Sequence, residues 1–419
     1  MSTTTTTTTV GGIKVVKPTV QSHIRDYWGR VRGGDLGSLP AVLGLIALCI
    51  IFAVTTDTFT SSLNVGNLFN QGAQGIFIAM GLVFVLLLGE IDLSAGFASG
   101  MSGAVMAVLL TNHGLPAYVA IPAALLTGVV SGFVLGFLVA KVGIPSFVVT
   151  LAAFLGFQGI LLLLVKGGTL IAVRDKFTLS LNQNNLSVTW SWVLAAVIIL
   201  LFAGVQFTNA RSRLSRGLVS DPWGIIAARI VGLAVVTIVG TALLTQERAI
   251  NPAINSLKGV PIVVPIVGFF YVLWTFVLSR TTFGRHIYAV GGNTEAARRA
   301  GIPVDRIRIS VFVLGQLMAA VGGIIQVSRA ASVDPNTGGS SVLLYAVAAA
   351  VIGGTSLFGG KGKIINAVVG GLVIAVINNG MALLNVSDGV RYMVTGIILL
   401  VAASVDALSR RRAAATGNR

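Results

Sequence analysis

Long apolar runs separated by short polar segments are the feature that most restricts how this chain can fold. A helix needs about 20 consecutive apolar residues to cross the hydrocarbon core of a bilayer. Twelve runs reach or approach that length: 40–55, 73–89, 94–111, 117–140, 146–165, 190–207, 225–244, 260–279, 307–327, 342–358, 364–384 and 390–408. We therefore expect an all-α polytopic membrane protein with about 12 transmembrane helices.

Composition supports lipid as the main solvent of this chain. Only 10% of its 419 residues are charged and the mean hydropathy is +0.91, whereas about a quarter of the residues in a soluble protein are charged. The 51 glycines fit helices that pack closely through small residues, for example from Gly128 to Gly136. The single cysteine, Cys49, lies inside an apolar run and is expected to be core filler.

The net charge of +16 predicts an orientation rather than a nucleic-acid partner, because the basic residues lie in short clusters between apolar runs. If the N-terminus is cytoplasmic and the spans alternate, 22 of the 29 Lys and Arg residues fall on the cytoplasmic side. The positive-inside rule then favours an N-in, C-in topology. We expect a disordered basic cytoplasmic tail (1–39), a transmembrane domain (40–408) with a cytoplasmic loop (280–306), and a second basic cytoplasmic tail (409–419).

Two acids, Glu90 and Asp92, interrupt the apolar sequence in "LLLGEIDLSAG". Their i, i+2 spacing places them on different faces of a helix, which argues against a proton-sharing carboxylate pair. Asp92 or Ser94 can cap the helix that follows. A cytoplasmic turn is the favoured interpretation, and an ion- or proton-coupling acid within the membrane is the alternative.

No catalytic or nucleotide-binding motif is evident. The string "GGTSLFGGKGK" lacks the Ser or Thr that follows the lysine of a Walker A loop. The three histidines are scattered and predict no metal site. "GEIDLSAG" and "GGTSLFGG" both read G-x-x-x-L-x-x-G, which is either a weak internal repeat of the kind found in transporters or a chance match.

The longest predicted cytoplasmic loop between spans contains "NTEAARRAG", which is typical of a short capped helix. Asn293 or Thr294 can cap its start, and Gly301 with Pro303 can end it. Its small residues Ala296, Ala297 and Ala300 suggest a docking surface rather than a catalytic one. A solvated connector is the alternative.

Four strings, "GEIDLSAG", "YAVGGNTEAARRAGI", "VIGGTSLFGGKGKI" and "INNGMALLNVS", occur in the order seen in ABC-importer permeases of the ribose and xylose type. The resemblance runs from about Leu39 to Asp406 and is strongest to the xylose type. It implies a ten-helix permease core with an inserted pair of spans within 190–244. It also implies the transport subunit of an ATP-driven importer for a monosaccharide, xylose or a related pentose, in the bacterial inner membrane.

The resemblance also implies partners and site residues. A cytoplasmic ATPase subunit would use ATP and Mg, so this chain would bind no cofactor itself and would not be an enzyme. An external sugar-binding protein, a second permease copy and membrane lipid are the other expected partners. The matching positions are a coupling set (Gly292, Asn293, Glu295, Ala296, Ala297, Arg298 and Gly301) and a signature turn (Glu90, Asp92, Leu93 and Gly96).

Amide side chains inside or beside the apolar runs are candidates for the path of a neutral sugar, which needs weak and exchangeable hydrogen bonds. They are Asn67, Asn70, Gln71, Gln74, Asn378 and Asn379. Hydrogen bonding between helices is the alternative role of each. Two other functions remain open: a proton- or sodium-coupled secondary transporter, and an ABC permease for another small solute such as branched-chain amino acids.

Overall fold

All twelve predicted spans coincide with helices in the computed structural model, which describes residues 7–10, 13–16, 37–166, 168–218, 220–249, 251–252 and 256–415. These helices are α2 (Leu39–Thr55), α3 (Ser62–Leu87), α4 (Ala95–Ala107) continued by η1 (Val108–Asn112), α5 (Ala117–Phe137) continued by η2 (Leu138–Val142), α6 (Ser146–Leu164), α8 (Val188–Ser215), α9 (Trp223–Leu244), α10 (Val263–Arg280), α13 (Val304–Ala330), α14 (Ser340–Ile352), α15 (Ile364–Leu383) and α16 (Asp388–Ala415).

Within the described part of the chain, nine helices are long and apolar enough to cross a membrane, while α2 and α14 are shorter. This confirms an all-α polytopic membrane protein. The number of spans and their orientation stay predictions.

The small remaining elements lie between or before these helices. Three short helices are α7 (Lys176–Gln183), α11 (Thr282–Gly292) and α12 (Thr294–Arg299). Strand β3 (Ile171–Ala172) pairs with β4 (Ser332–Val333).

The tail predicted to be disordered (1–39) contains an antiparallel strand pair, β1 (Thr7–Val10) with β2 (Ile13–Val16). Its Thr and Val residues favour extended backbone. Residues 1–6, 11–12 and 17–36 lie outside the described residues. At the other end, α16 extends to Ala415 into the predicted basic tail, and residues 416–419 lie outside the description.

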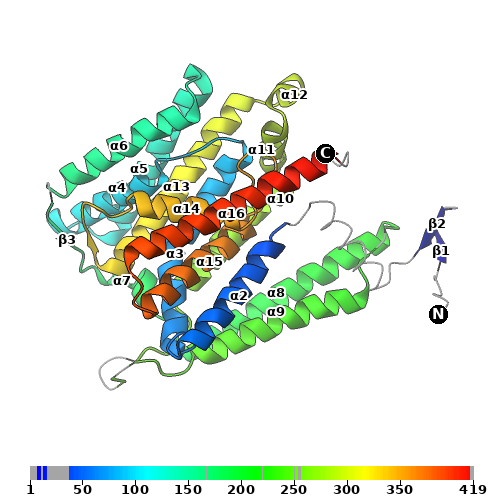
Figure 1. The fold of residues 1–419 in the computed structure, drawn as a ribbon, viewed down its shortest axis with the longest axis horizontal. Helices are drawn as coiled ribbons and strands as arrows, with labels where there is room; N and C mark the ends of the chain where they lie inside the picture. Colours follow the sequence, from blue (N-terminus) through cyan, green and yellow to red (C-terminus); the bar gives the residue numbers. More distant parts are fainter. Residues whose placement is uncertain are drawn as a thin grey trace. The chain divides into compact units, whose positions relative to one another are not determined.

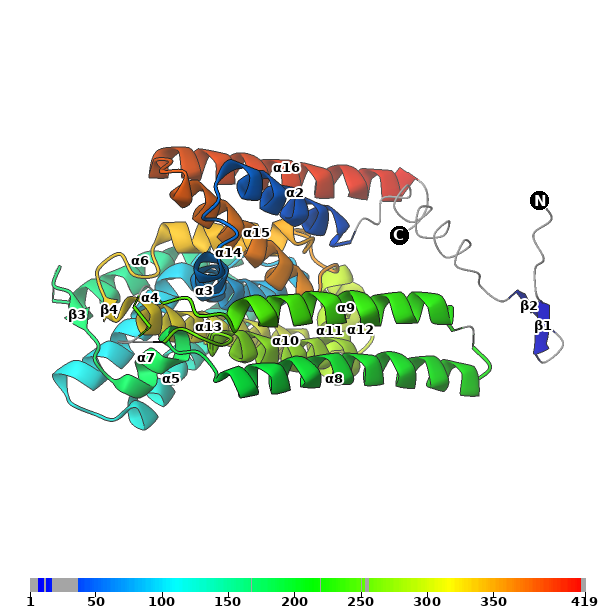
Figure 2. The same ribbon diagram turned by 90° about the horizontal axis from the view of Figure 1, so that it is seen from below.

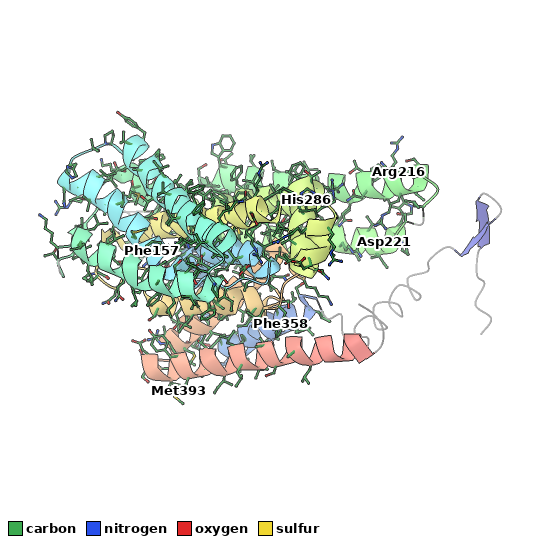
Figure 3. The ribbon with its side chains drawn as sticks, turned by 90° about the horizontal axis from the view of Figure 1, so that it is seen from above. Phe157, Arg216, Asp221, His286, Phe358 and Met393 are labelled. Atoms are coloured by element: carbon green, nitrogen blue, oxygen red, sulfur yellow. The ribbon has the colours of Figure 1, made fainter. Side chains whose placement is uncertain are left out.

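The chain divides into two compact units, and the first comprises Met1–Leu36, Leu186–Val260 and Leu408–Arg419. Its segment Leu186–Val260 contains α8 and α9. The two helices run antiparallel side by side (Figure 2). Figure 3 labels Arg216 and Asp221, which flank the connection between them. This is the pair of spans that we expected to be an insertion into a ten-helix core.

The second unit comprises Gly37–Asn185 and Pro261–Ala407. Helix α13 packs on α3, α4 and α5, and α15 packs on α3 and α14 (Figure 1). Glycine makes these contacts possible: a Cβ on Gly128 would lie 2.7 Å from the carbonyl oxygen of Gln316, and one on Gly81 would lie 2.7 Å from that of Gly315. The predicted close packing through small residues is therefore confirmed at Gly128.

Two predicted boundaries need correction. The run 342–358 is helical only to Ile352, because Gly354 adopts a φ of +104° and a side chain at Gly353 would overlap the backbone of Asn366. At 13 residues, α14 is about 20 Å long and is too short to span the hydrocarbon core alone. Conversely, α3 begins at Ser62, so the amides expected at its edge lie within the helix.

Candidate functional site

Two helices, α11 and α12, occupy the segment that was predicted to be a cytoplasmic loop with one short helix. Asn293 is the N-cap of α12, and its Oδ1 accepts a hydrogen bond from the backbone N–H of Ala296 at 2.9 Å. Gly301 follows the helix with a φ of +80°. The predicted start of α12 at Asn293 and its predicted end at Gly301 are therefore confirmed. Helix α11 was not predicted, although Phe283, Ile287 and Val290 repeat at helical spacing within it.

The predicted coupling set has one inward-facing member. Gly292, Asn293, Glu295, Ala296, Arg298 and Gly301 are exposed. Ala297 is only 4% exposed and belongs to the same core cluster as Val304 and Ile307. Its methyl group therefore fills space beneath α12 and is not available to a docking partner, which corrects the interpretation of Ala297 as part of the docking surface.

Four glycines, which we call the glycine junction, bring three segments together where α11 ends. They are Gly89 after α3, Gly291 in α11, and Gly359 with Gly360 between α14 and α15. A Cβ on Gly291 would overlap the carbonyl oxygen of Leu87, and one on Gly359 would lie 2.8 Å from the carbonyl oxygen of Gly291. This backbone contact tolerates no side chain at either position.

Two hydrogen bonds hold the same junction. The N–H of Gly360 donates to the carbonyl oxygen of Leu87 at 2.9 Å. The hydroxyl of Tyr288, in α11, donates to the carbonyl oxygen of Gly362 at 2.7 Å. Figure 3 labels Phe358 in this connection and His286 in α11. The strings "GEIDLSAG" and "GGTSLFGG" therefore lie in contact with each other and with the end of α11, which leads into α12.

The two acids of the signature turn face different partners, as their spacing predicted. Oε1 of Glu90 lies 3.2 Å from Nε of Arg308, at the start of α13. Oδ1 of Asp92 accepts hydrogen bonds from the backbone N–H and the hydroxyl of Ser94 at 2.8 and 2.6 Å. Oδ2 of Asp92 accepts one from Nε2 of Gln316 at 2.6 Å. Asp92 therefore fixes the start of α4 to the middle of α13.

Asp92 lies buried within the predicted turn. Asp92 is 1% exposed, and Ser94 and Gln316 are fully buried beside it. A buried carboxyl group needs hydrogen-bond donors, and Ser94 and Gln316 supply three. Sequence reasoning missed Gln316, whose only signal was an isolated amide within the run 307–327.

The other two turn residues have packing roles. Leu93 is half-buried and packs against a core cluster that includes Ile78 and Leu343. A Cβ on Gly96 would lie 2.8 Å from the carbonyl oxygen of Gly338. Glycine at position 96 therefore permits the start of α4 to approach the backbone that precedes α14.

The candidate path amides differ in their hydrogen-bond partners and in their exposure. Asn379 exchanges two amide hydrogen bonds of 2.8 Å with Asn64, and its Nδ2 also donates to Oε1 of Gln71 at 3.3 Å. These side chains join α3 to α15, which is the helix-bonding role that was left open. Gln74 is 9% exposed and buried between helices. The remaining three are Asn67, which is exposed, and Asn70 and Asn378, which are half-buried.

Within the described residues, no group of three or more His, Cys, Asp or Glu side chains is placed to hold a metal ion. A pocket of about 780 Å³ is lined by η1, the end of α6 and β3, and it is remote in sequence from the coupling set. Its lining includes Lys166, Arg174 and Asp175.

Residues 64–403 match the family of branched-chain amino acid transport system permease components. The chain therefore belongs to this permease family. It is a multi-pass protein of the bacterial cytoplasmic membrane and has the build of an ABC-importer permease subunit.

Particular relatives narrow the comparison. The chain is 36% identical over 372 residues to the xylose transport system permease protein XylH of Escherichia coli strain K12, covering 88% of this chain and 92% of the relative. It is 33% identical to XylH of Haemophilus influenzae, covering 90% and 98%. It is 31% identical to the ribose import permease protein RbsC of Bacillus subtilis strain 168, covering 89% and 94%. No solved structure matches the chain.

Proposed function

We propose that this chain is the membrane-spanning subunit of an ATP-driven importer for a monosaccharide, with xylose or a related pentose as substrate. The similarity to xylose and ribose permeases over nearly the whole chain supports the sugar class. The sequence contains no Walker A motif, and we assign ATP hydrolysis to a separate subunit.

One observation carries the coupling mechanism: the exposed face of α12 is connected by the glycine junction to both α3 and the α14–α15 connection. In the N-in topology, a cytoplasmic ATPase subunit that binds ATP and Mg docks on Gly292, Asn293, Glu295, Ala296 and Arg298. Displacement of α11 then moves Leu87 and Gly360, whose backbones it touches. The motion reaches the start of α4 through the signature turn.

The other partners follow from the same proposal. An external sugar-binding protein delivers substrate to the opposite face, and a second copy of the permease completes the pathway between the two chains. The chain itself binds no cofactor. Among the path candidates we favour Asn70 and Gln74, because each has a buried polar atom without a partner among the described residues, whereas Gln71 and Asn379 bond to each other.

Uptake by cells that lack this chain tests the substrate. Labelled xylose, ribose and leucine are supplied in turn, and the chain is restored on a plasmid. We expect xylose uptake to be lost without the chain and restored with it, while leucine uptake stays constant. Loss of leucine uptake instead would show that the substrate is a branched-chain amino acid and not a sugar.

Replacing Asp92 with asparagine is expected to leave membrane insertion intact but to lower ATP-coupled uptake several-fold. The new amide directs N–H groups at Ser94 or Gln316, which are themselves donors, and an unsatisfied buried donor costs about 1–3 kcal/mol. Rotation of the Gln316 amide relieves part of this, because its Oε1 has no hydrogen-bond partner among the described residues. Uptake is measured relative to the permease level in the membrane.

Asp57, which is exposed, provides the matched control. Asp57→Asn is expected to transport normally, because its carboxylate already faces solvent. Normal uptake by Asp92→Asn at a normal protein level would show that the carboxylate is not needed for coupling.

A further inference from the structure

Four amide side chains from three helices converge near the C-terminal end of α13. They are Asn70 and Gln74 in α3, Asn182 in α7 and Gln326 in α13. Nδ2 of Asn182 lies 3.3 Å from the carbonyl oxygen of Asn70 and 3.4 Å from that of Ile325, so the amide bridges α3 and α13.

The register of α3 against α13 places the remaining two amides at the same level. A Cβ on Gly322 would lie 3.2 Å from the carbonyl oxygen of Gln74. Because the two helices run in opposite directions, Asn70, one turn beyond Gln74, lies at the level of Gln326, which is one turn beyond Gly322. The four amides therefore form one cluster.

Each of the four has a buried polar atom with no hydrogen-bond partner among the described residues: Oδ1 of Asn70, Nε2 of Gln74, Oδ1 of Asn182 and Oε1 of Gln326. Asn182 is 1% exposed and Gln74 is 9% exposed. Buried polar atoms are hydrogen-bonded in the great majority of cases. Three acceptors and one donor in one cluster are suited to a small molecule that carries several hydroxyl groups.

Helix α7 covers this cluster, and hydrogen bonds join it to α13. The backbone N–H of Asn182 donates to Oγ of Ser328 at 2.9 Å, and that hydroxyl donates to the carbonyl oxygen of Leu179 at 3.0 Å. Nε2 of Gln183 donates to the carbonyl oxygen of Ser328 at 2.9 Å. Such hydrogen bonds are individually modest in net strength, and Leu181 of α7 also packs against the buried core.

The chemistry of the cluster selects the ligand class. None of the four side chains is charged, so the cluster offers no countercharge to an anion or a cation. Neutral amides exchange hydrogen bonds readily with hydroxyl groups. We infer that Asn70, Gln74, Asn182 and Gln326 form a binding station for a neutral polyhydroxylated solute beneath α7. This inference rests on the proposed function for the direction of transport, but not for the binding chemistry.

Two near-isosteric substitutions, Gln74→Met and Gln326→Met, test the station together and separately. The permease is reconstituted with its ATPase and binding protein, and uptake of labelled xylose, ATP hydrolysis and the thermal midpoint are measured. We expect uptake to fall at least tenfold while ATP hydrolysis persists. The thermal midpoint should stay constant or rise, because each substitution removes an unsatisfied buried atom. Ser180→Ala is the control, since among the described residues that hydroxyl bonds within α7, to the carbonyl oxygen of Phe177.

Two results would overturn the inference. One is normal uptake by the double variant. The other is loss of uptake in proportion to loss of thermal stability, which would give these amides a purely structural role.

Direct binding separates failure of the station from failure of the proposed importer. Saturation-transfer NMR with xylose as the probe is applied to the purified wild-type permease and to the double variant. Binding to the wild type that is lost in the variant supports the station even if no ATP-driven uptake is found. Equal signals from both proteins, or none from either, contradict it.

Discussion

Replacing Ala296 with glutamate is expected to abolish ATP-driven uptake while the permease stays in the membrane at its normal level. Ala296 is exposed on the first turn of α12, where an acid suits the helix dipole, so the helix itself is preserved. A charge buried without a partner in the docking interface costs about 2 kcal/mol or more, equal to at least about a 30-fold loss of affinity. Co-purification of the ATPase subunit and uptake of labelled sugar measure the effect.

The neighbouring position provides the contrast. Ala297 is buried beneath α12, so Ala297→Glu is expected to reduce the amount of folded permease, not only its docking. Ser212→Glu, an exposed change in α8, is expected to have little effect on either measurement. Wild-type uptake and co-purification by Ala296→Glu would show that the ATPase subunit does not dock on this face of α12.

Replacing Gly291 with alanine is expected to disrupt the glycine junction and with it both stability and uptake. The new methyl group would overlap the carbonyl oxygen of Leu87, which also accepts the hydrogen bond of Gly360. Overpacking costs about 1–3 kcal/mol, and the obstacle here is backbone rather than a flexible side chain. We expect the free energy of unfolding to fall by an amount near the upper end of this range, and the thermal midpoint to fall by several degrees.

Gly268→Ala in α10 is the matched control, because a Cβ there meets nothing within 4 Å. It should be neutral or slightly stabilising, since alanine favours a helix over glycine. An unchanged midpoint and normal uptake for Gly291→Ala would mean that α11 does not need close contact with α3. The proposed route from α12 to the signature turn would then be wrong.

Local signals in the sequence predicted much of this fold. Each of the twelve apolar runs coincides with a helix, because burial in lipid requires continuous hydrophobic surface. Asn293 and Gly301 marked the ends of α12 because capping depends on neighbouring residues alone. Helix α14 was predicted too long because an apolar run does not reveal that Gly353 must meet the backbone of Asn366.

The candidate site was less predictable because its contacts are distant in sequence. Asp92 was identified, but its partner Gln316 lies 224 residues away in the sequence. An isolated amide within an apolar run was the only sign of Gln316. Ala297 matched the docking pattern, yet which face of a six-residue helix is buried depends on α13. The roles of Gln71 and Asn379 were decided by the packing of α3 against α15, which periodicity alone does not specify.

Measuring which energy source drives sugar uptake is the most direct test of the central claim that this permease belongs to an ATP-driven sugar importer. The permease and its ATPase subunit are reconstituted in proteoliposomes. Labelled xylose and the binding protein are added on one side of the membrane, and ATP is supplied on the opposite side, where α12 lies. We predict uptake that requires ATP and both partners and that persists when proton and sodium gradients are dissipated. Uptake by the permease alone, driven by either gradient without ATP, would contradict the account and favour a secondary transporter.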